Sequence, residues 1–76
     1  MTQNQKILRH LRLYGSIDPM TAIREYGIMR LGARIYDLKR DHNIVSIRKD
    51  GRNRFGEPCH WAVYYMNNKE QGDYNE

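Results

Sequence analysis

Residues 21–38 read TAIREYGIMRLGARIYDL, and this stretch decides the fold. Gly27 lies near its centre, between two segments whose apolar residues have helical spacing. Asp18 and Pro19, just ahead of the stretch, are residue types favoured at an N-cap and at a first helical position. After Gly27, apolar residues recur at steps of three, four and three: Ile28, Leu31, Ile35 and Leu38. The sequence therefore predicts a short helix that starts at Pro19, a tight turn at Gly27, and a longer helix that extends to about Arg40.

Another helix is predicted ahead of this pair, over residues 3–14. Thr2 and Gln5 have the spacing of a capping box, and Gly15 suits the left-handed position that ends many helices. Residues 16–17 are expected to form a very short extended stretch. The short helix that follows should make about two turns, with an inward face that carries Met20, Ala22 and Ile23.

The helical period ends before residue 44, and a hairpin is predicted beyond it. Ile44, Val45 and Ile47 are β-branched and predict a strand. Residues 49–58 are polar and contain two glycines and a proline, so we expect a long basic loop. Residues 59–66 predict the second strand. Its core side is expected to carry Trp61, Val63 and Tyr65. The predicted fold is α+β, mainly α, with three helices followed by a two-stranded hairpin.

Length and charge limit the classes of function. The chain has 76 residues, so it can form one small core but not a multi-lobed enzyme with a deep cleft. Residues 1–66 carry 12 basic and 6 acidic side chains, a charge of +6, and are expected to form one domain. Residues 67–76 carry 1 basic and 3 acidic side chains and no aliphatic one, so we expect a flexible acidic polar tail. The predicted domain is therefore strongly basic.

The sequence predicts neither catalysis nor metal binding. Cys59 is the only cysteine. The three histidines, His10, His42 and His60, are too far apart for a helical pair of ligands. Adjacent strand residues point to opposite faces, which excludes Cys59 with His60 as a nucleophilic pair. We expect no enzymatic activity, no cofactor and no metal. No apolar run suits a membrane span or a signal peptide, which predicts a cytoplasmic protein without a membrane partner.

Residues 21–38 resemble the core of the small winged helix-turn-helix proteins common in phages and prophages, and the likeness extends more loosely over residues 5–65. In those proteins, a stretch similar to residues 26–28 forms the turn, and one similar to residues 30–38 forms the recognition helix. The resemblance implies a winged, intracellular protein that binds DNA.

Residue types agree with a recognition helix at about residues 29–40 and a wing at residues 49–56. A helix in the major groove needs small residues where its backbone approaches base edges and long donors elsewhere. Between Arg30 and Arg54 the sequence holds 8 basic and 3 acidic residues, which favours phosphate contact. The candidate DNA-binding residues of the helix are Met29, Arg30, Gly32, Ala33, Arg34, Tyr36 and Arg40. Those of the hairpin are Arg48, Lys49, Arg52, Asn53 and Arg54.

Some of these residues also have structural interpretations. Arg34 has the i,i+3 spacing to Asp37 of an ordinary surface ion pair. Tyr36 also suits a half-buried aromatic that covers the hairpin. The first predicted helix offers outer phosphate contacts at Lys6, Arg9 and Arg12.

The resulting hypothesis is sequence-specific binding of double-stranded DNA by a regulator of phage or prophage type. The alternatives are a protein-binding winged helix, such as an antirepressor or host-defence inhibitor with a phage or host protein as partner, and a recombination directionality factor. The expected oligomeric state is a monomer or a weak dimer.

Overall fold

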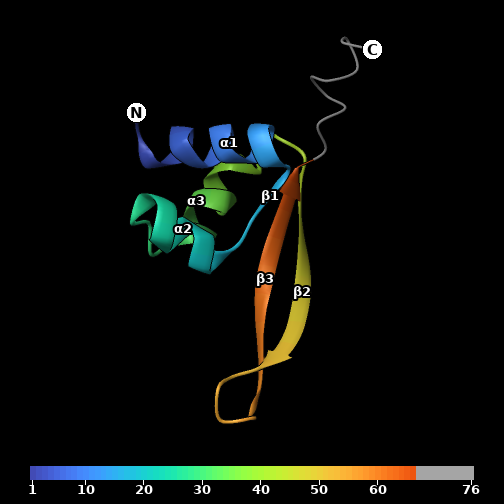
Figure 1. Cartoon of the computed structure of the whole chain (residues 1–76). Helices are drawn as coiled ribbons and strands as arrows, with labels where there is room; N and C mark the ends of the chain where they lie inside the picture. Colours follow the sequence, from blue (N-terminus) through green and yellow to red (C-terminus); the bar gives the residue numbers. More distant parts are fainter. Residues whose placement is uncertain (67–76) are drawn as a thin grey trace.

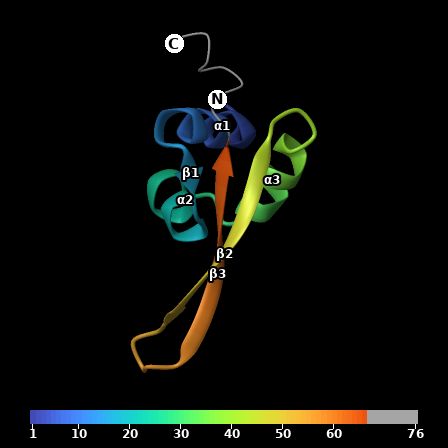
Figure 2. The same cartoon turned by 90° about the vertical axis from the view of Figure 1, so that its right-hand side faces the viewer.

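The computed structural model describes residues 1–66, and its helices gather at one end of a long hairpin (Figure 1). The elements are α1 (Gln3–Tyr14), β1 (Ser16–Ile17), α2 (Pro19–Tyr26), α3 (Leu31–Leu38), β2 (Ile44–Arg52) and β3 (Pro58–Met66). The tail predicted at residues 67–76 lies outside the described residues. In the second view the two long strands cross as they leave the helices, which shows the twist of the hairpin (Figure 2).

The ends of α1 and α2 confirm the capping predictions. Thr2 accepts a hydrogen bond from the Gln5 backbone N–H, and the Gln5 side chain accepts one from the Thr2 N–H. Asp18 caps α2 by accepting from the Thr21 N–H at 2.7 Å. Gly15 and Gly27 end these helices at φ values of +87° and +67°, where a glycine avoids the steric cost of a side chain. Local backbone chemistry thus fixes both helices as predicted.

The third helix is shorter than the predicted range of about 29–40. Arg30 has φ −111° and ψ 59°, which is not helical, so α3 begins at Leu31 and Met29 lies in the preceding turn. At the other end, the N–H groups of Asp41 and His42 both bond to the Leu38 carbonyl, which closes a turn in place of further helix. Arg40 therefore lies in the exit turn and not on α3.

The predicted two-stranded hairpin is present, but it belongs to a three-stranded sheet that was not predicted. The strand order is β1-β3-β2, and both pairings are antiparallel. Ser16 pairs with Tyr65 and Ile17 with Tyr64. The extended stretch at 16–17 was predicted, but its partner was not, because pairing across 48 residues leaves no local sequence signal.

The strands of the hairpin also extend further than expected, and the loop is shorter. β2 continues through Lys49 to Arg52, and β3 begins at Pro58, so the predicted loop at 49–58 contracts to residues 53–57. Arg52 pairs with Pro58 at the end of the ladder. We call residues 53–57 the hairpin tip. Backbone pairing extends the ladder through polar residues because a strand in water needs no apolar side chains to bond its neighbour.

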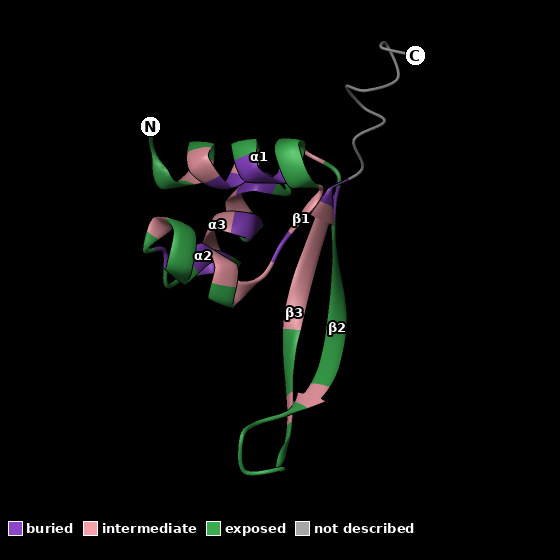
Figure 3. Cartoon of the chain, in the orientation of Figure 1, coloured by how far each residue is buried: buried purple, intermediate pink, exposed green. Residues whose placement is uncertain are grey.

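The hydrophobic core lies between the helices and the near end of the sheet (Figure 3). It confirms the predicted apolar stripe of the third helix, since Ile28, Leu31, Ile35 and Leu38 are all buried. The other buried apolar residues are Ile7, Leu11, Ile17, Ala22, Ile44 and Met66. Each fully buried Ile or Leu side chain contributes about 1.5–3 kcal/mol relative to an exposed one.

Two groups of predicted core residues lie outside this core. Met20 is 61 % exposed and Ile23 is exposed as well, because α2 turns Ala22 inward and these two residues flank it. On β3, Tyr64 packs against the core and Met66 is buried, so the alternate residues occupy the opposite face. Those residues are Trp61, Val63 and Tyr65; Trp61 is 39 % exposed and the other two are partly buried.

Candidate nucleic-acid interface

The outer side of α3 and the turn before it form an exposed surface, which we call the α3 surface. Its residues are Met29, Arg30, Ala33 and Tyr36. Met29 is 79 % exposed and Tyr36 is 76 % exposed, so neither side chain serves the core. Tyr36 therefore does not cover the hairpin as a half-buried aromatic. The α3 surface offers one long cationic donor, one phenol and two apolar groups to a ligand.

A shallow hollow of about 440 Å³ lies beside this surface. Its lining combines part of the α3 surface with Gln3 from the first turn of α1 and Gly27 from the turn; the full set is Gln3, Gly27, Met29, Arg30, Ala33 and Arg34. Sequence reasoning missed Gln3, because its proximity to α3 comes from tertiary packing of α1 and leaves no pattern in the chain.

Arg34 lies at the flank of the α3 surface and makes an ion pair. Its Nη2 lies 3.7 Å from Asp37 Oδ2, the i,i+3 pair that the sequence also allows. Asn4 of α1 donates to the same Asp37 oxygen at 3.5 Å, which links the start of α1 to α3. The guanidinium is thus partly engaged and is less available to a ligand than that of Arg30.

Gly32 and Arg40 lie at the margins of this surface. Gly32 is exposed, and a Cβ added there would lie 3.8 Å from Tyr64 Oη, an ordinary van der Waals contact. Its ordinary backbone leaves room for a small side chain. Arg40 is exposed in the turn after α3, next to exposed Lys39. The predicted helix residues are therefore brought together at 29–36, whereas Arg40 extends the positive charge beyond the helix end.

The basic residues of β2 divide between the two faces of the hairpin. Arg48 and Arg52 lie on one face of the strand, and Lys49 lies on the other. Arg48 Nε donates to Asp50 Oδ1 at 3.0 Å on the exposed surface. Lys49 pairs in register with Trp61, and the Trp61 ring covers Gly51 so closely that a Cβ there would approach it to 3.0 Å. The predicted hairpin residues thus form no single face.

The hairpin tip is held by hydrogen bonds among its own residues and by one from Arg52 at the end of β2. Asn53 Oδ1 accepts from the backbone N–H groups of Phe55 and Glu57 at 2.9 and 3.0 Å. Asn53 Nδ2 donates to Glu57 Oε1 at 2.9 Å. Arg52 Nη1 donates to the Gly56 carbonyl at 2.7 Å. Asn53 therefore has a structural role in the tip.

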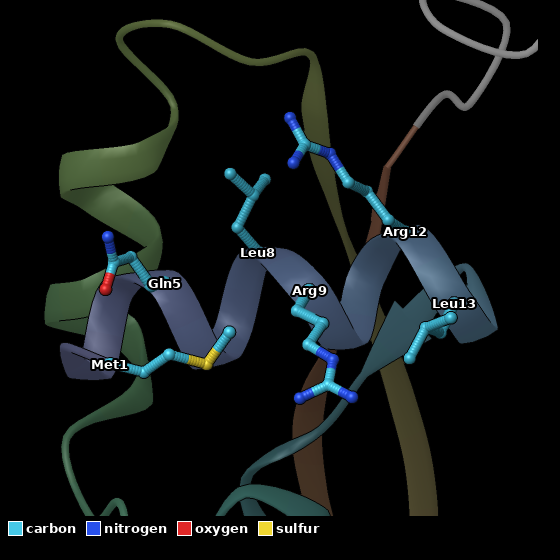
Figure 4. Close-up of a pocket in the computed structure, with 6 residues that line it drawn as sticks. All are labelled: Met1, Gln5, Leu8, Arg9, Arg12 and Leu13. Carbon is cyan, nitrogen blue, oxygen red and sulfur yellow. The ribbon is translucent and has the colours of Figure 1, made fainter.

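A second hollow, of about 560 Å³, lies on the outer side of α1 (Figure 4). It is lined by Met1, Gln5, Leu8, Arg9, Arg12 and Leu13, and we call it the α1 groove. Leu8 and Arg12 project on one side of the helix axis in the figure, and Arg9 and Leu13 on the other. The α1 groove shares no lining residue with the hollow beside α3. Arg9 and Arg12 thus belong to a separate surface.

His10 joins α1 to α2 beneath these surfaces. Its Nδ1 lies 2.6 Å from Tyr26 Oη, and the two rings meet edge to face with centroids 5.5 Å apart. Burial lowers the pKa of His10, while the negative charges of Glu25 and Asp18 oppose that shift. Burial also raises the pKa of Tyr26. The contact fixes α2, and with it the turn that presents α3.

The comparison with known families decides the classification. The family model described as a winged helix-turn-helix domain matches residues 2–69. The chain belongs to this family. No curated protein matches it. In this winged helix-turn-helix domain, α2 and α3 with their turn form the helix-turn-helix, and the β2–β3 hairpin forms the wing.

Within residues 1–66, the domain brings no three His, Cys, Asp or Glu side chains together in a group that could hold a metal ion. The helices of this described part are also too short or too polar to cross a membrane.

Proposed function

We propose that the winged helix-turn-helix domain binds double-stranded DNA in a sequence-specific manner. In this proposal α3 enters the major groove, and the hairpin contacts the flanking backbone or the adjacent minor groove. The DNA-contacting set is the one predicted from the sequence, with Arg30 as the principal base contact. The biological role proposed is transcriptional regulation of phage or prophage type, exerted by occupancy of a DNA site.

The α3 surface is the observation that carries the proposal. Arg30 stands at the start of α3 and is exposed, which is the position from which recognition helices reach base edges. Ala33, one turn further, is small enough for the helix backbone to approach a base pair. Met29 and Tyr36 expose apolar groups that suit thymine methyl or sugar contacts. Arginine at such a site pairs with both acceptors of guanine.

The charge balance around α3 and the hairpin supports phosphate contacts. Of the 3 acidic residues between Arg30 and Arg54, Asp37 and Asp50 already face Arg34 and Arg48 in ion pairs. The Arg48–Asp50 pair is exposed and the Arg34–Asp37 pair is partly exposed, so both are screened by solvent and cost little to break. The cations outside them are Arg30, Lys39, Arg40, Lys49, Arg52 and Arg54. Such an excess of positive charge attracts a polyanion from either side of the helix.

Two charge reversals test the groove-docking arrangement. Arg30→Glu is expected to abolish binding to duplex DNA, because loss of a bidentate base contact costs about 1–3 kcal/mol and the carboxylate adds repulsion. Arg9→Glu, in the α1 groove, changes the net charge equally and is expected only to weaken binding. Fluorescence anisotropy of a labelled duplex measures both. Equal losses from the two variants would contradict docking through α3.

The α1 groove favours one second candidate, an acidic protein partner. It places Leu8 beside Arg12 on one side of α1 and Leu13 beside Arg9 on the other, on a surface separate from α3. A partner with acidic and apolar residues would complement it. Loss of partner binding in Arg9→Glu, while binding to duplex DNA is only weakened, would assign the two functions to two surfaces.

A further inference from the structure

The tip of the wing presents an aromatic side chain that the fold does not use. Phe55 is 72 % exposed and lies outside the core cluster. Its neighbours Asn53 and Arg54 are predicted DNA contacts, whereas Phe55 is not among them. The Arg54 guanidinium carbon lies 4.8 Å from the centroid of the Phe55 ring. The tip thus combines an exposed apolar ring with an adjacent cation.

The loop that carries Phe55 is ordered by its own residues. Asn53 accepts from the Phe55 N–H and from the Glu57 N–H, and its backbone N–H donates to the Glu57 carbonyl at 2.9 Å. Gly56 adopts φ +81°, which permits the tight turn after Phe55. The backbone that carries the ring is therefore held before a ligand arrives, which reduces the entropy that binding would cost.

The charge around Phe55 suits a ligand with an anionic exterior and an apolar interior. Arg52 lies at the base of the tip and Arg54 within it, so two cations stand against the single carboxylate of Glu57, one oxygen of which accepts from Asn53 Nδ2. Duplex DNA has this distribution, because phosphates line the edges of the minor groove and stacked bases lie between them.

The length of the wing matches the distance between grooves. From Ser46 to Arg52 β2 is exposed or partly exposed, and at a rise of about 3.3 Å per residue this part spans roughly 20 Å. One turn of DNA is about 34 Å, so the minor groove lies about 17 Å along the axis from the major groove at the same face. The tip lies at the end of the hairpin away from the helices (Figure 1). With α3 in the major groove, a wing of this length is long enough to reach a neighbouring minor groove.

We propose that Phe55 is a wedge that enters the minor groove between two base pairs, and that the domain bends the DNA it binds. This inference rests on the proposed DNA binding. As the Phe55 ring enters the base stack, the Arg54 guanidinium moves off the ring and pairs with a phosphate. Arg52 pairs with a phosphate as well. Apolar wedges of this kind kink DNA toward the major groove by on the order of 20–90°. Beyond binding, the proposed activity of the domain is therefore the bending of DNA.

The test uses a duplex of about 20 base pairs with a donor and an acceptor dye at its ends, containing a deformable TA step. Anisotropy measures binding, and energy transfer between the dyes measures bending. The wild-type protein is expected to raise energy transfer at saturation. Phe55→Ala should bind with less than about a tenfold loss of affinity, because the arginines and α3 remain, but should lose the rise in transfer. Leu13→Ala removes an exposed apolar side chain from α1 and should keep both signals.

The outcomes separate the two proposals. Equal energy transfer with Phe55→Ala and wild type, or wild-type binding without any change in transfer, would overturn the wedge and leave DNA binding intact. Failure of the wild-type protein to bind the duplex would overturn both. Phe55 and Leu13 are exposed, so circular dichroism should show both variants folded as the wild type is.

Discussion

His10 makes the stability of the domain depend on pH. Its pKa is lowered from the ordinary value of 6.5 by burial, so the unfolded chain takes up the proton more readily than the folded one. The stabilisation is complete above about pH 6.5 and is lost as the pH falls toward the folded-state pKa. We expect a lower Tm at about pH 5.5 than at about pH 7.5.

Two variants identify the group responsible for that loss. His60→Gln, at an exposed position on β3, is expected to keep the drop in Tm. His10→Gln retains a hydrogen-bonding side chain beside Tyr26 but does not ionise, so its Tm should change less between the two pH values. If the Tm of His10→Gln falls between the two pH values by as much as the Tm of the wild type, another group controls the acid sensitivity.

Single residues were predictable where their role is set by nearby backbone. Asp18 and Gly27 were identified correctly because a cap and a left-handed turn depend on a few adjacent residues. The exposure of Met20 and Ile23 was not predicted, because the side of a two-turn helix that faces the core depends on the elements packed against it. Phe55, the proposed wedge, was not among the predicted contact residues, although it is an aromatic residue in a polar glycine-flanked loop.

The turn between α2 and α3 depends on the conformation of Gly27. Its φ of +67° disfavours any residue with a Cβ, although no heavy atom lies within 4 Å of where that Cβ would be. Gly27→Ala is therefore expected to reduce the free energy of unfolding by about 1–2 kcal/mol through backbone strain alone. Gly32→Ala, within α3, should leave stability unchanged or raise it by up to about 1 kcal/mol. Urea denaturation measures the free energy of unfolding of both variants. Similar losses of stability in Gly27→Ala and Gly32→Ala would show that backbone strain at Gly27 does not cause the loss.

At the level of elements, sequence periodicity predicted the type and order of the helices and long strands but not every boundary. The helical stripe ending at Leu38 was correct, yet the helix starts two residues later and stops earlier than predicted. The ends of the hairpin strands and the pairing of β1 with β3 escaped prediction. Helix ends without a side-chain cap and strand partners far apart in sequence depend on tertiary contacts.

Across the whole molecule, the sequence predicted the basic character of the surface better than its arrangement. The charge of +6 over residues 1–66 could be counted directly. The separation of Lys49 from Arg48 by strand alternation, and the proximity of Gln3 to α3, required the folded chain. The central claim is that this surface binds duplex DNA. It predicts that several phosphates are contacted at once, and their number can be measured.

That claim is tested most directly by the salt dependence of binding to a labelled non-specific duplex, followed by fluorescence anisotropy at two salt concentrations. Contact with about five phosphates predicts that log K falls with log salt at a slope of about −4 to −5. A slope in this range would support duplex DNA as the partner of the wing and α3. No binding even at low salt would contradict the account and direct attention to a protein partner at the α1 groove.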